Sequence, residues 1–342
     1  MKKNLFTMIL CACAFTSLSF YSCSQESTSS NQGPTTAKSY TVHLGFGGEI
    51  TNISTSPLTK AAVADTDLYG IQVYSCPATS SSSPTYTQYA YGLFNNKSDM
   101  TVNLLQGYIY KFVCTMVVNG KNKLYSSSSC SSYLTPYSAS KSSWGQLNNQ
   151  FTYSTSDYFS GLAEGFSMLS SDGKDYERPN TDRYYGELTG FVPAENASAS
   201  ISMKRVTFGA KFIAEGLTDG KLKISMKEAP DIYITYPNTT VQDIFTFDNE
   251  NNYYSNPMAW TQDDYSETVS TSITWIKADG AAIPLATQDI TFKRNMLTTI
   301  TVKVNDTSSK DGIDINKETT SMGDGGSVTI TGSSSGSTTV NP

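Results

Sequence analysis

The sequence contains a single histidine, His43, among 342 residues. A histidine-based metal site requires two or three imidazoles, and a Ser-His-Asp arrangement could be built only on this residue. His43 lies on the polar face of an alternating segment, which indicates an ordinary solvent-facing side chain. The sequence offers no G-x-S-x-G elbow between a strand and a helix, no Walker A loop and no G-x-G-x-x-G before a helix. We therefore expect a protein that is not an enzyme and that holds no cofactor or metal.

Charged residues are also scarce, at 16% of the chain, whereas about 25% is usual in soluble domains. The net charge is −6 and the pI is near 4.9, which argues against nucleic acid as a partner because phosphates require a basic face. Polarity comes largely from serine instead, and aromatic residues reach 12% with 22 tyrosines. Composition thus excludes more classes of function than it identifies.

The first 22 residues have the features of a lipoprotein signal peptide. Two lysines at the start precede a short apolar stretch that is interrupted by Thr and Ser, and Ser22 stands before the expected cleavage point. Phe20-Tyr21-Ser22-Cys23 resembles a bacterial lipobox, so we predict lipidation of Cys23 by chains such as palmitate, which would anchor the protein to the outer membrane. Residues 23–37 are then a polar linker.

Three cysteines remain after the signal and the lipidated residue are set aside. Cys76, Cys114 and Cys130 allow at most one intramolecular disulfide, and Cys76 and Cys114 in strand-like runs could equally be buried free thiols. No C-x-x-C spacing is present, which disfavours a thiol-based zinc site.

The body of the chain alternates between apolar and polar residues with a period of two, which is typical of half-buried strands. The segment from Tyr40 to Phe46 and the segment from Leu297 to Val304 are examples, and Asn119-Gly120 indicates a hairpin. Helical spacing is weak throughout, with its best candidate near residues 140–150. Many short strands of this kind predict an all-β chain built of β-sandwiches.

A break near Pro193–Ser198 divides the body into an N-terminal domain over 38–195 and a C-terminal domain over 196–305. Residues 306–342 form a tail rich in Ser, Gly and Thr. One island in the tail, Ser327–Thr331, alternates like a strand through Val328 and Ile330. The tail is therefore predicted to be flexible apart from this island.

Three stretches resemble the fimbrillin family of Bacteroidales, which are lipoprotein-derived pilus subunits. They are Ser56–Tyr74, the basic-flanked strand from Met203-Lys204-Arg205-Val206 to Phe212, and Phe292-Lys293-Arg294-Asn295-Met296-Leu297 leading into Val302. The resemblance implies two transthyretin-like β-sandwich domains in tandem. It also implies a structural role in a surface polymer.

The resemblance further implies assembly by strand exchange. The chain would be cut in the loop after its first strand, where Lys60 is the candidate cut site. A strand from the next subunit would then fill the groove that the first strand leaves. The donor is either the island with Val328 and Ile330 or the strand with Ile300, Val302 and Val304.

The leading hypothesis is thus a structural pilus subunit on the outer membrane and cell surface, which polymerises with its neighbours and binds host or bacterial surface ligands. An uncleaved anchor or tip subunit of the same pilus is one alternative. A glycan-binding surface lipoprotein is another, and exposed, coplanar Trp260 or Trp275 would favour it.

Overall fold

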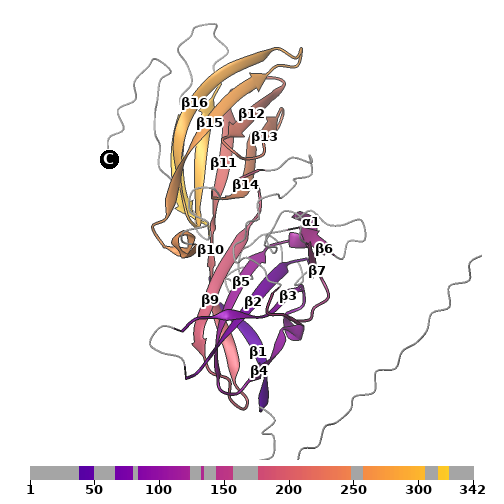
Figure 1. The fold of residues 1–342 in the computed structure, drawn as a ribbon. Coiled ribbons are helices and arrows are strands. Elements are labelled where there is room, and N and C mark those ends of the chain that lie inside the picture. Colours follow the sequence, from indigo (N-terminus) through magenta and orange to yellow (C-terminus); the bar gives the residue numbers. More distant parts are fainter. Residues whose placement is uncertain are drawn as a thin grey trace, which may run out of the picture. The chain divides into compact units, whose positions relative to one another are not determined.

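The structure is a computed structural model, and it describes most of the chain after Ala37 (Figure 1). The described residues are 38–49, 66–79, 84–123, 132–134, 144–156, 176–247, 257–304 and 315–322. Cys23, Lys60, Cys130, Val328 and Ile330 lie outside these ranges, so the predictions on them stay predictions.

The first half of the described chain forms a sheet of eight strands in the order β4-β1-β10-β9-β5-β2-β3-β8. The strands are β1 (Ser39–Gly48), β2 (Leu68–Pro77), β3 (Thr87–Phe94), β4 (Thr101–Leu105), β5 (Tyr108–Val117), β8 (Thr152–Tyr153), β9 (Arg183–Phe191) and β10 (Ser198–Arg205). Neighbours run antiparallel except β1 and β10, which pair in parallel. The first strand of the described residues, β1, is therefore an internal strand of its sheet.

The second half forms two sheets of four strands, in the orders β14-β11-β17-β18 and β13-β12-β15-β16. The strands are β11 (Thr207–Glu215), β12 (Lys221–Met226), β13 (Ile232–Thr235), β14 (Thr240–Thr246), β15 (Ser266–Ile276), β16 (Ala282–Lys293), β17 (Met296–Lys303) and β18 (Ile315–Ser321). Apolar residues of both sheets share one hydrophobic core, as expected for sheets that pack face to face.

Helices are short within the described residues. They are the 3-10 turns η2 (Lys97–Asp99) and η3 (Pro257–Thr261) and one helical turn, α1 (Gly120–Lys123). A separate pair of short strands, β6 (Ser132–Leu134) and β7 (Trp144–Gln146), completes the described elements.

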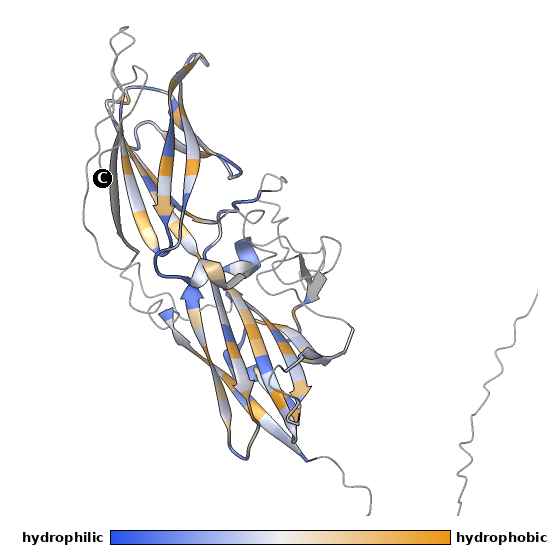
Figure 2. Ribbon diagram, turned by 60° about the vertical axis from the view of Figure 1, so that its left-hand side comes forward, coloured by the Kyte–Doolittle hydropathy of each residue, from blue (hydrophilic) through white to orange (hydrophobic). Residues whose placement is uncertain are grey.

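Burial follows the alternation of the sequence along the strands. In β12, for example, Leu222, Ile224 and Met226 are buried while Lys221, Lys223 and Ser225 are half-buried. Figure 2 shows the same exchange of hydrophobic and hydrophilic residues along both halves of the structure. This period of two is what a pleated strand with one buried face requires. The all-β prediction is confirmed.

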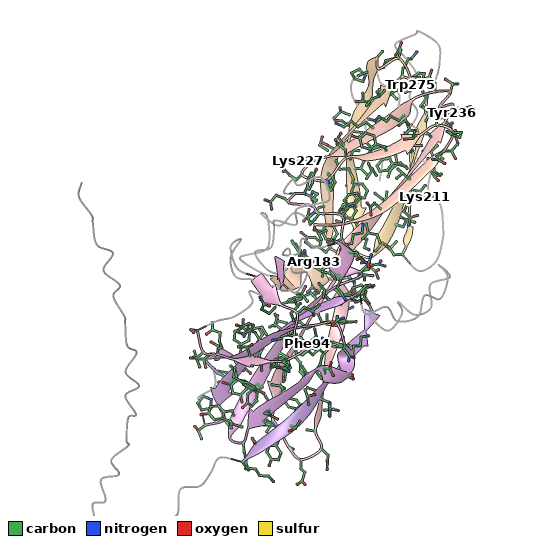
Figure 3. The ribbon with its side chains drawn as sticks, turned by 90° about the vertical axis from the view of Figure 1, so that its right-hand side faces the viewer. Phe94, Arg183, Lys211, Lys227, Tyr236 and Trp275 are labelled. Atoms are coloured by element: carbon green, nitrogen blue, oxygen red, sulfur yellow. The ribbon has the colours of Figure 1, made fainter. Side chains whose placement is uncertain are left out.

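The buried residues gather in two main cores. One lies within the eight-stranded sheet and includes Phe94, and the other lies between the two four-stranded sheets and includes Trp275 (Figure 3). Apart from Val113 and Tyr185, the buried residues of the second core come from Val206 onward. The strand β10 belongs to the first sheet although it follows the break near Pro193. The number of domains, their transthyretin-like character and the limits 38–195 and 196–305 stay predictions.

Three local expectations differ from the structure. Asn119-Gly120 leads into the helical turn α1 and not into a hairpin, and the segment near residues 140–150, the best of the weak helix candidates, contains β7. The tail was expected to be flexible outside Ser327–Thr331, but residues Ile315–Ser321 form β18, which pairs with β17 at the edge of its sheet.

Candidate functional site

The first strand lies between β4 and β10 and is paired along both edges. Its register with β10 runs from His43↔Ser198 to Gly48↔Met203, and its register with β4 runs from Ser39↔Leu105 to His43↔Thr101. Val42 and Leu44 are buried in the core of the eight-stranded sheet, and His43 between them is exposed, as predicted. Removal of β1 would therefore leave an apolar groove with an unpaired strand on each side.

The outer edge of β4, away from β1, is held by tyrosine hydroxyls. Tyr89 Oη donates to the carbonyl of Asn103 at 2.7 Å, and the N–H of Asn103 donates to Tyr153 Oη at 2.9 Å. Tyr110 Oη accepts from the N–H of Leu105 at 2.7 Å and donates to its carbonyl at 3.2 Å. These bonds connect β4 to β3, β5 and β8 without using β1.

The three tyrosines also support one another by packing. The ring of Tyr89 meets the ring of Tyr110 at a centroid distance of 5.2 Å and the ring of Tyr153 at 5.5 Å, both edge to face. Such pairs contribute about 0.5–1.5 kcal/mol beyond the burial of area. Burial raises the pKa of Tyr89 and of Tyr110, so both hydroxyls stay neutral and able to donate at ordinary pH. One wall of the groove is thus fixed independently of the strand that fills it.

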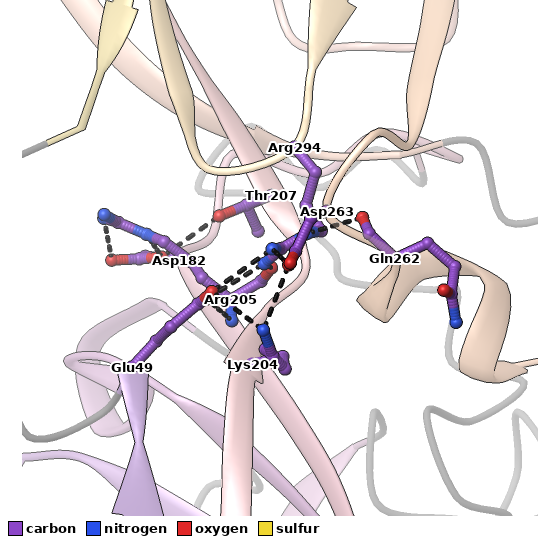
Figure 4. A network of polar contacts seen from close by, with 8 residues as sticks. All are labelled: Glu49, Asp182, Lys204, Arg205, Thr207, Gln262, Asp263 and Arg294. Atoms are coloured by element: carbon purple, nitrogen blue, oxygen red, sulfur yellow. Dashed lines mark hydrogen bonds and ion pairs between the residues drawn. The ribbon is translucent and has the colours of Figure 1, made fainter.

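The far end of the groove is closed by a network of charged side chains (Figure 4). Glu49 follows β1 directly, and its carboxylate accepts from Nη1 of Arg294 at 2.9 Å and from Nη2 at 3.2 Å. Glu49 Oε2 also accepts from the backbone N–H of Arg205, at the end of β10, at 2.7 Å. The end of the first strand is therefore tied both to its neighbour strand and to the second half of the chain.

Arg294 comes from the turn between β16 and β17 and is only 4% exposed. Besides its two bonds to Glu49, its guanidinium donates to the carbonyls of Arg205 (2.7 Å) and Gln262 (2.8 Å) and to Asp263 Oδ1 (2.6 Å). Five hydrogen bonds match the five N–H donors of a guanidinium. A buried cation is tolerated here because its donors have acceptors.

Two further basic residues complete the network. Arg205 makes a two-pronged pair with Asp182, with N···O distances of 2.7 and 2.5 Å, and Thr207 Oγ1 donates to the same carboxylate at 3.1 Å. Lys204 Nζ lies 3.0 Å from Asp263 and 3.6 Å from Glu49. The network thus joins the ends of β1 and β10 to the residues that follow η3 and to the β16–β17 turn.

The surroundings of Glu49 stabilise its ionised form. Partial burial alone would raise its pKa, but hydrogen bonds from Arg294 and Arg205 and the charges of Arg294 and Lys204 outweigh that effect, so the pKa of Glu49 lies below its ordinary value. The hydrogen bond and charge of Lys204 similarly lower the pKa of exposed Asp263, with a contribution from Arg294. Both carboxylates are therefore ionised at neutral pH.

The network brings together two of the stretches on which the resemblance rests. Lys204 and Arg205 belong to the second stretch and Arg294 to the third, and the structure places them around one carboxylate. Sequence reasoning missed Glu49. Its only local signal is a charged residue directly after an alternating strand.

The alternative donor strand, β17, lies in the interior of its sheet between β11 and β18. Ile300 and Val302 are fully buried and Val304, directly after the strand, is nearly so. For Cys76 and Cys114 the sequence left open a disulfide or buried free thiols, and in the structure both are buried free thiols. Trp260 and Trp275 are both buried, so neither provides the exposed aromatic face that glycan binding would favour.

Two features are absent from the described residues. No group of three or more His, Cys, Asp or Glu side chains in this part of the chain could hold a metal ion. Among the same residues, no helix has the length and apolar character needed to cross a membrane.

No known family model and no curated protein matches the chain. Among solved structures, it is similar to the tip fimbrial protein Mfa3 of Porphyromonas gingivalis, with 9% identity, a TM-score of 0.32, and 82% of this chain and 100% of that chain covered. The fimbrial anchor protein Mfa2 of the same organism matches at 8% identity and a TM-score of 0.33, over 82% of this chain and 98% of that chain. A candidate adhesin from Bacteroides thetaiotaomicron matches at 12% identity and a TM-score of 0.35, over 84% and 99%.

Proposed function

We propose that this chain is a structural pilus subunit that is exported as a lipoprotein through Cys23 and assembled by strand exchange. The observation that carries the proposal is the position of β1, which is internal to its sheet and paired on both edges, and which ends at the segment that contains Lys60. A cut at Lys60 separates β1 from the rest of the chain. The groove that β1 occupies is then available to a strand of a second copy.

The physical driving force is the pairing of exposed strand edges. Without β1, the inner edges of β4 and β10 present unpaired N–H and C=O groups beside the pockets of Val42 and Leu44. Such an edge is a template for an added strand, in which main-chain hydrogen bonds give affinity and side-chain pockets give specificity. The tyrosine bonds to Asn103 and Leu105 support the proposal because they keep β4 in place after β1 has left.

Of the two donor candidates, we favour the island in the tail with Val328 and Ile330. Donation of β17 would break its ladders with both β11 and β18 and remove Ile300 and Val302 from the second core. The space that each of these side chains would leave in the second core costs about 2–5 kcal/mol. The tail island alternates in the same way and would leave the core intact.

The first test examines how the protein is processed in the bacterium that naturally produces it. Surface protein is purified, its N-terminus is sequenced, and its migration is examined without boiling. The proposal expects mature chains that begin at Ala61 and SDS-resistant ladders, and expects Lys60→Ala to abolish both while the matched control Lys123→Ala changes neither. Intact, acylated monomer as the sole product would contradict processing and would support the alternative of an uncleaved anchor or tip subunit.

The second test separates the donor candidates. Val328→Asp combined with Ile330→Asp is expected to abolish ladders without changing the urea midpoint of the monomer. Val340→Asp, another apolar residue of the tail that lacks the alternating neighbours, serves as the matched control and should leave the ladders unchanged. Ladders that persist in the double variant would exclude the tail island as the donor.

A further inference from the structure

Glu49 covers a buried arginine that stays behind when the first strand leaves. Its carboxylate accepts two of the five hydrogen bonds of Arg294 and the N–H of Arg205. Arg294 is attached to β17 by the turn that precedes it, so it remains in place when residues 1–60 are removed. The empty groove would therefore end on a buried guanidinium that has lost two of its five hydrogen bonds and on a backbone N–H that has lost its acceptor.

The groups that remain compensate this loss only weakly. The carbonyls of Arg205 and Gln262 and the carboxylate of Asp263 still accept from Arg294. The carbonyls carry no net charge, and the Asp263 side chain is 79% exposed and is shared with Lys204. Water screens an exposed partner of this kind. A buried cation that loses its carboxylate is strongly unfavourable, and a buried N–H without an acceptor adds to the cost. The end of the groove is consequently selective for an occupant that carries a negative charge.

We propose that the strand which replaces β1 must bring a carboxylate to Arg294, and that in assembly this carboxylate is Asp324 from the tail of a second copy of the chain. The inference rests on the proposed function, because it assumes that β1 is exchanged. It adds the requirement that the incoming strand carries a negative charge, which apolar pockets and main-chain pairing do not impose.

Sequence and charge point to Asp324. It is the one charged residue in 323–342 and it is acidic. In the first strand, the buried Leu44 stands five residues before Glu49; in the tail, Asp324 stands four residues before Val328. At about 3.3 Å per residue these spans are similar. The two segments match when Val328 takes the pocket of Leu44 and Ile330 takes the pocket of Val42, which brings Asp324 to the place of Glu49. In this arrangement the donor strand runs in the direction opposite to β1.

The need for a carboxylate can be tested without any natural processing. A recognition sequence for a specific protease is placed within residues 50–65 of the full chain, the folded protein is cut, and release of the labelled N-terminal fragment is followed over time in urea. Glu49→Gln is expected to release the fragment at least about tenfold faster, since a hydrogen bond to a charged group contributes more than a factor of ten. Equal rates would overturn the proposal.

Glu267→Gln is the matched control for that experiment. Glu267 lies on β15 and pairs with Arg178 at 2.5 Å, so this variant also removes a partly buried carboxylate from an arginine. It should leave the release rate of the first fragment within about twofold of wild type. A change as large as that of Glu49→Gln would show a general loss of stability and would count against a specific role of the Arg294 site.

The source of the carboxylate is tested in the assembled polymer. Asp324→Asn is expected to make ladders dissociate in SDS at least about tenfold faster, Asp324→Glu to restore most of their persistence, and Asp311→Asn, elsewhere in the tail, to have no effect. Unchanged ladders in Asp324→Asn would overturn the assignment.

If the Val328/Ile330 variant abolishes ladders while Asp324→Asn does not, the proposed function stands and this inference fails. If wild type forms no ladders, the proposed function fails, and the fragment-release experiment decides the role of Arg294 by itself.

Discussion

The tyrosine that supports β4 from inside the sheet offers a sharp test of how the groove is built. Tyr110 is fully buried, and its hydroxyl both accepts from the N–H and donates to the carbonyl of Leu105. Tyr110→Phe removes the hydroxyl and preserves the ring. Leu105 is half-buried, so water replaces the lost partner poorly.

We expect Tyr110→Phe to lower the free energy of unfolding by about 1–3 kcal/mol, the cost of leaving a buried polar group without its partner. With a urea m-value of about 2–3 kcal/mol/M, the midpoint should fall by about 0.3–1.5 M. The matched control is Tyr153→Phe, because Tyr153 bonds to the same strand but is 48% exposed, and water can take over its bond to Asn103. Its effect should stay within about 0.5 kcal/mol.

The measurement is equilibrium unfolding in urea followed by tyrosine and tryptophan fluorescence, with both variants at the same protein concentration. A Tyr110→Phe midpoint that coincides with that of Tyr153→Phe would refute the reasoning. It would mean that the hydroxyl bonds are not what holds the outer edge of β4.

Three further predictions concern other parts of the structure. Gly186→Ala on β9 should destabilise the chain by about 1–3 kcal/mol through overpacking, because an added Cβ would lie 2.4 Å from the carbonyl of Ser202 on β10, and urea unfolding measures this. The pKa of Glu49 in the folded state lies below its ordinary value, because the hydrogen bonds and charges of Arg294, Arg205 and Lys204 outweigh its burial. Glu49 therefore contributes stability that is present above its ordinary pKa and is lost as the pH falls through the lower pKa of the folded state. Unfolding midpoints should decline between neutral and acid pH less steeply in Glu49→Gln than in wild type. Cys76 and Cys114, buried as free thiols, should react with a thiol reagent only after unfolding, which mass spectrometry of labelled peptides detects, and labelling of the folded chain at either residue would contradict their burial.

Sequence alone predicted the strands well where one face is buried and the other is polar. The alternation of Val42 and Leu44 with exposed neighbours predicted β1, and the alternation of Ile300 and Val302 predicted β17. In these segments local pattern and tertiary burial agree, because a pleated strand exposes every second side chain. The weak helical spacing of the sequence agrees with the short helical turns of the described residues.

Long-range contacts explain where the local expectations were wrong. Asn119 has a positive φ of 54°, as a turn residue should, but its N–H donates to Asp67 at 2.8 Å and the N–H of Lys121 donates to the carbonyl of Thr66 at 2.9 Å. These hydrogen bonds, to residues about fifty positions earlier in the chain, fix the backbone after β5, which continues as a helical turn in place of a hairpin. The pairing edges of β5 are meanwhile taken by β2 and β9.

The candidate site was predicted only in part for the same reason. The basic residues Arg205 and Arg294 stood out within the stretches that carry the family resemblance, but Glu49 is 156 residues from Arg205 and 245 residues from Arg294. Nothing in the local pattern of a strand says which distant strand becomes its neighbour. The parallel pairing of β1 with β10, and with it the network, became visible only in three dimensions.

The long separation between β1 and β10 has a consequence for the order in which the chain can fold. Closing a loop of this length before any contact rewards it is slow, and chains are made from the N-terminus. The first strand to be synthesised therefore waits for one of the later strands before its second ladder can form, whereas β2, β3 and β5 find one another nearby in sequence. β1 gains its second ladder only when β10 arrives, and its later removal leaves the pairing of β10 with β9 and of β2 with β3 and β5 intact.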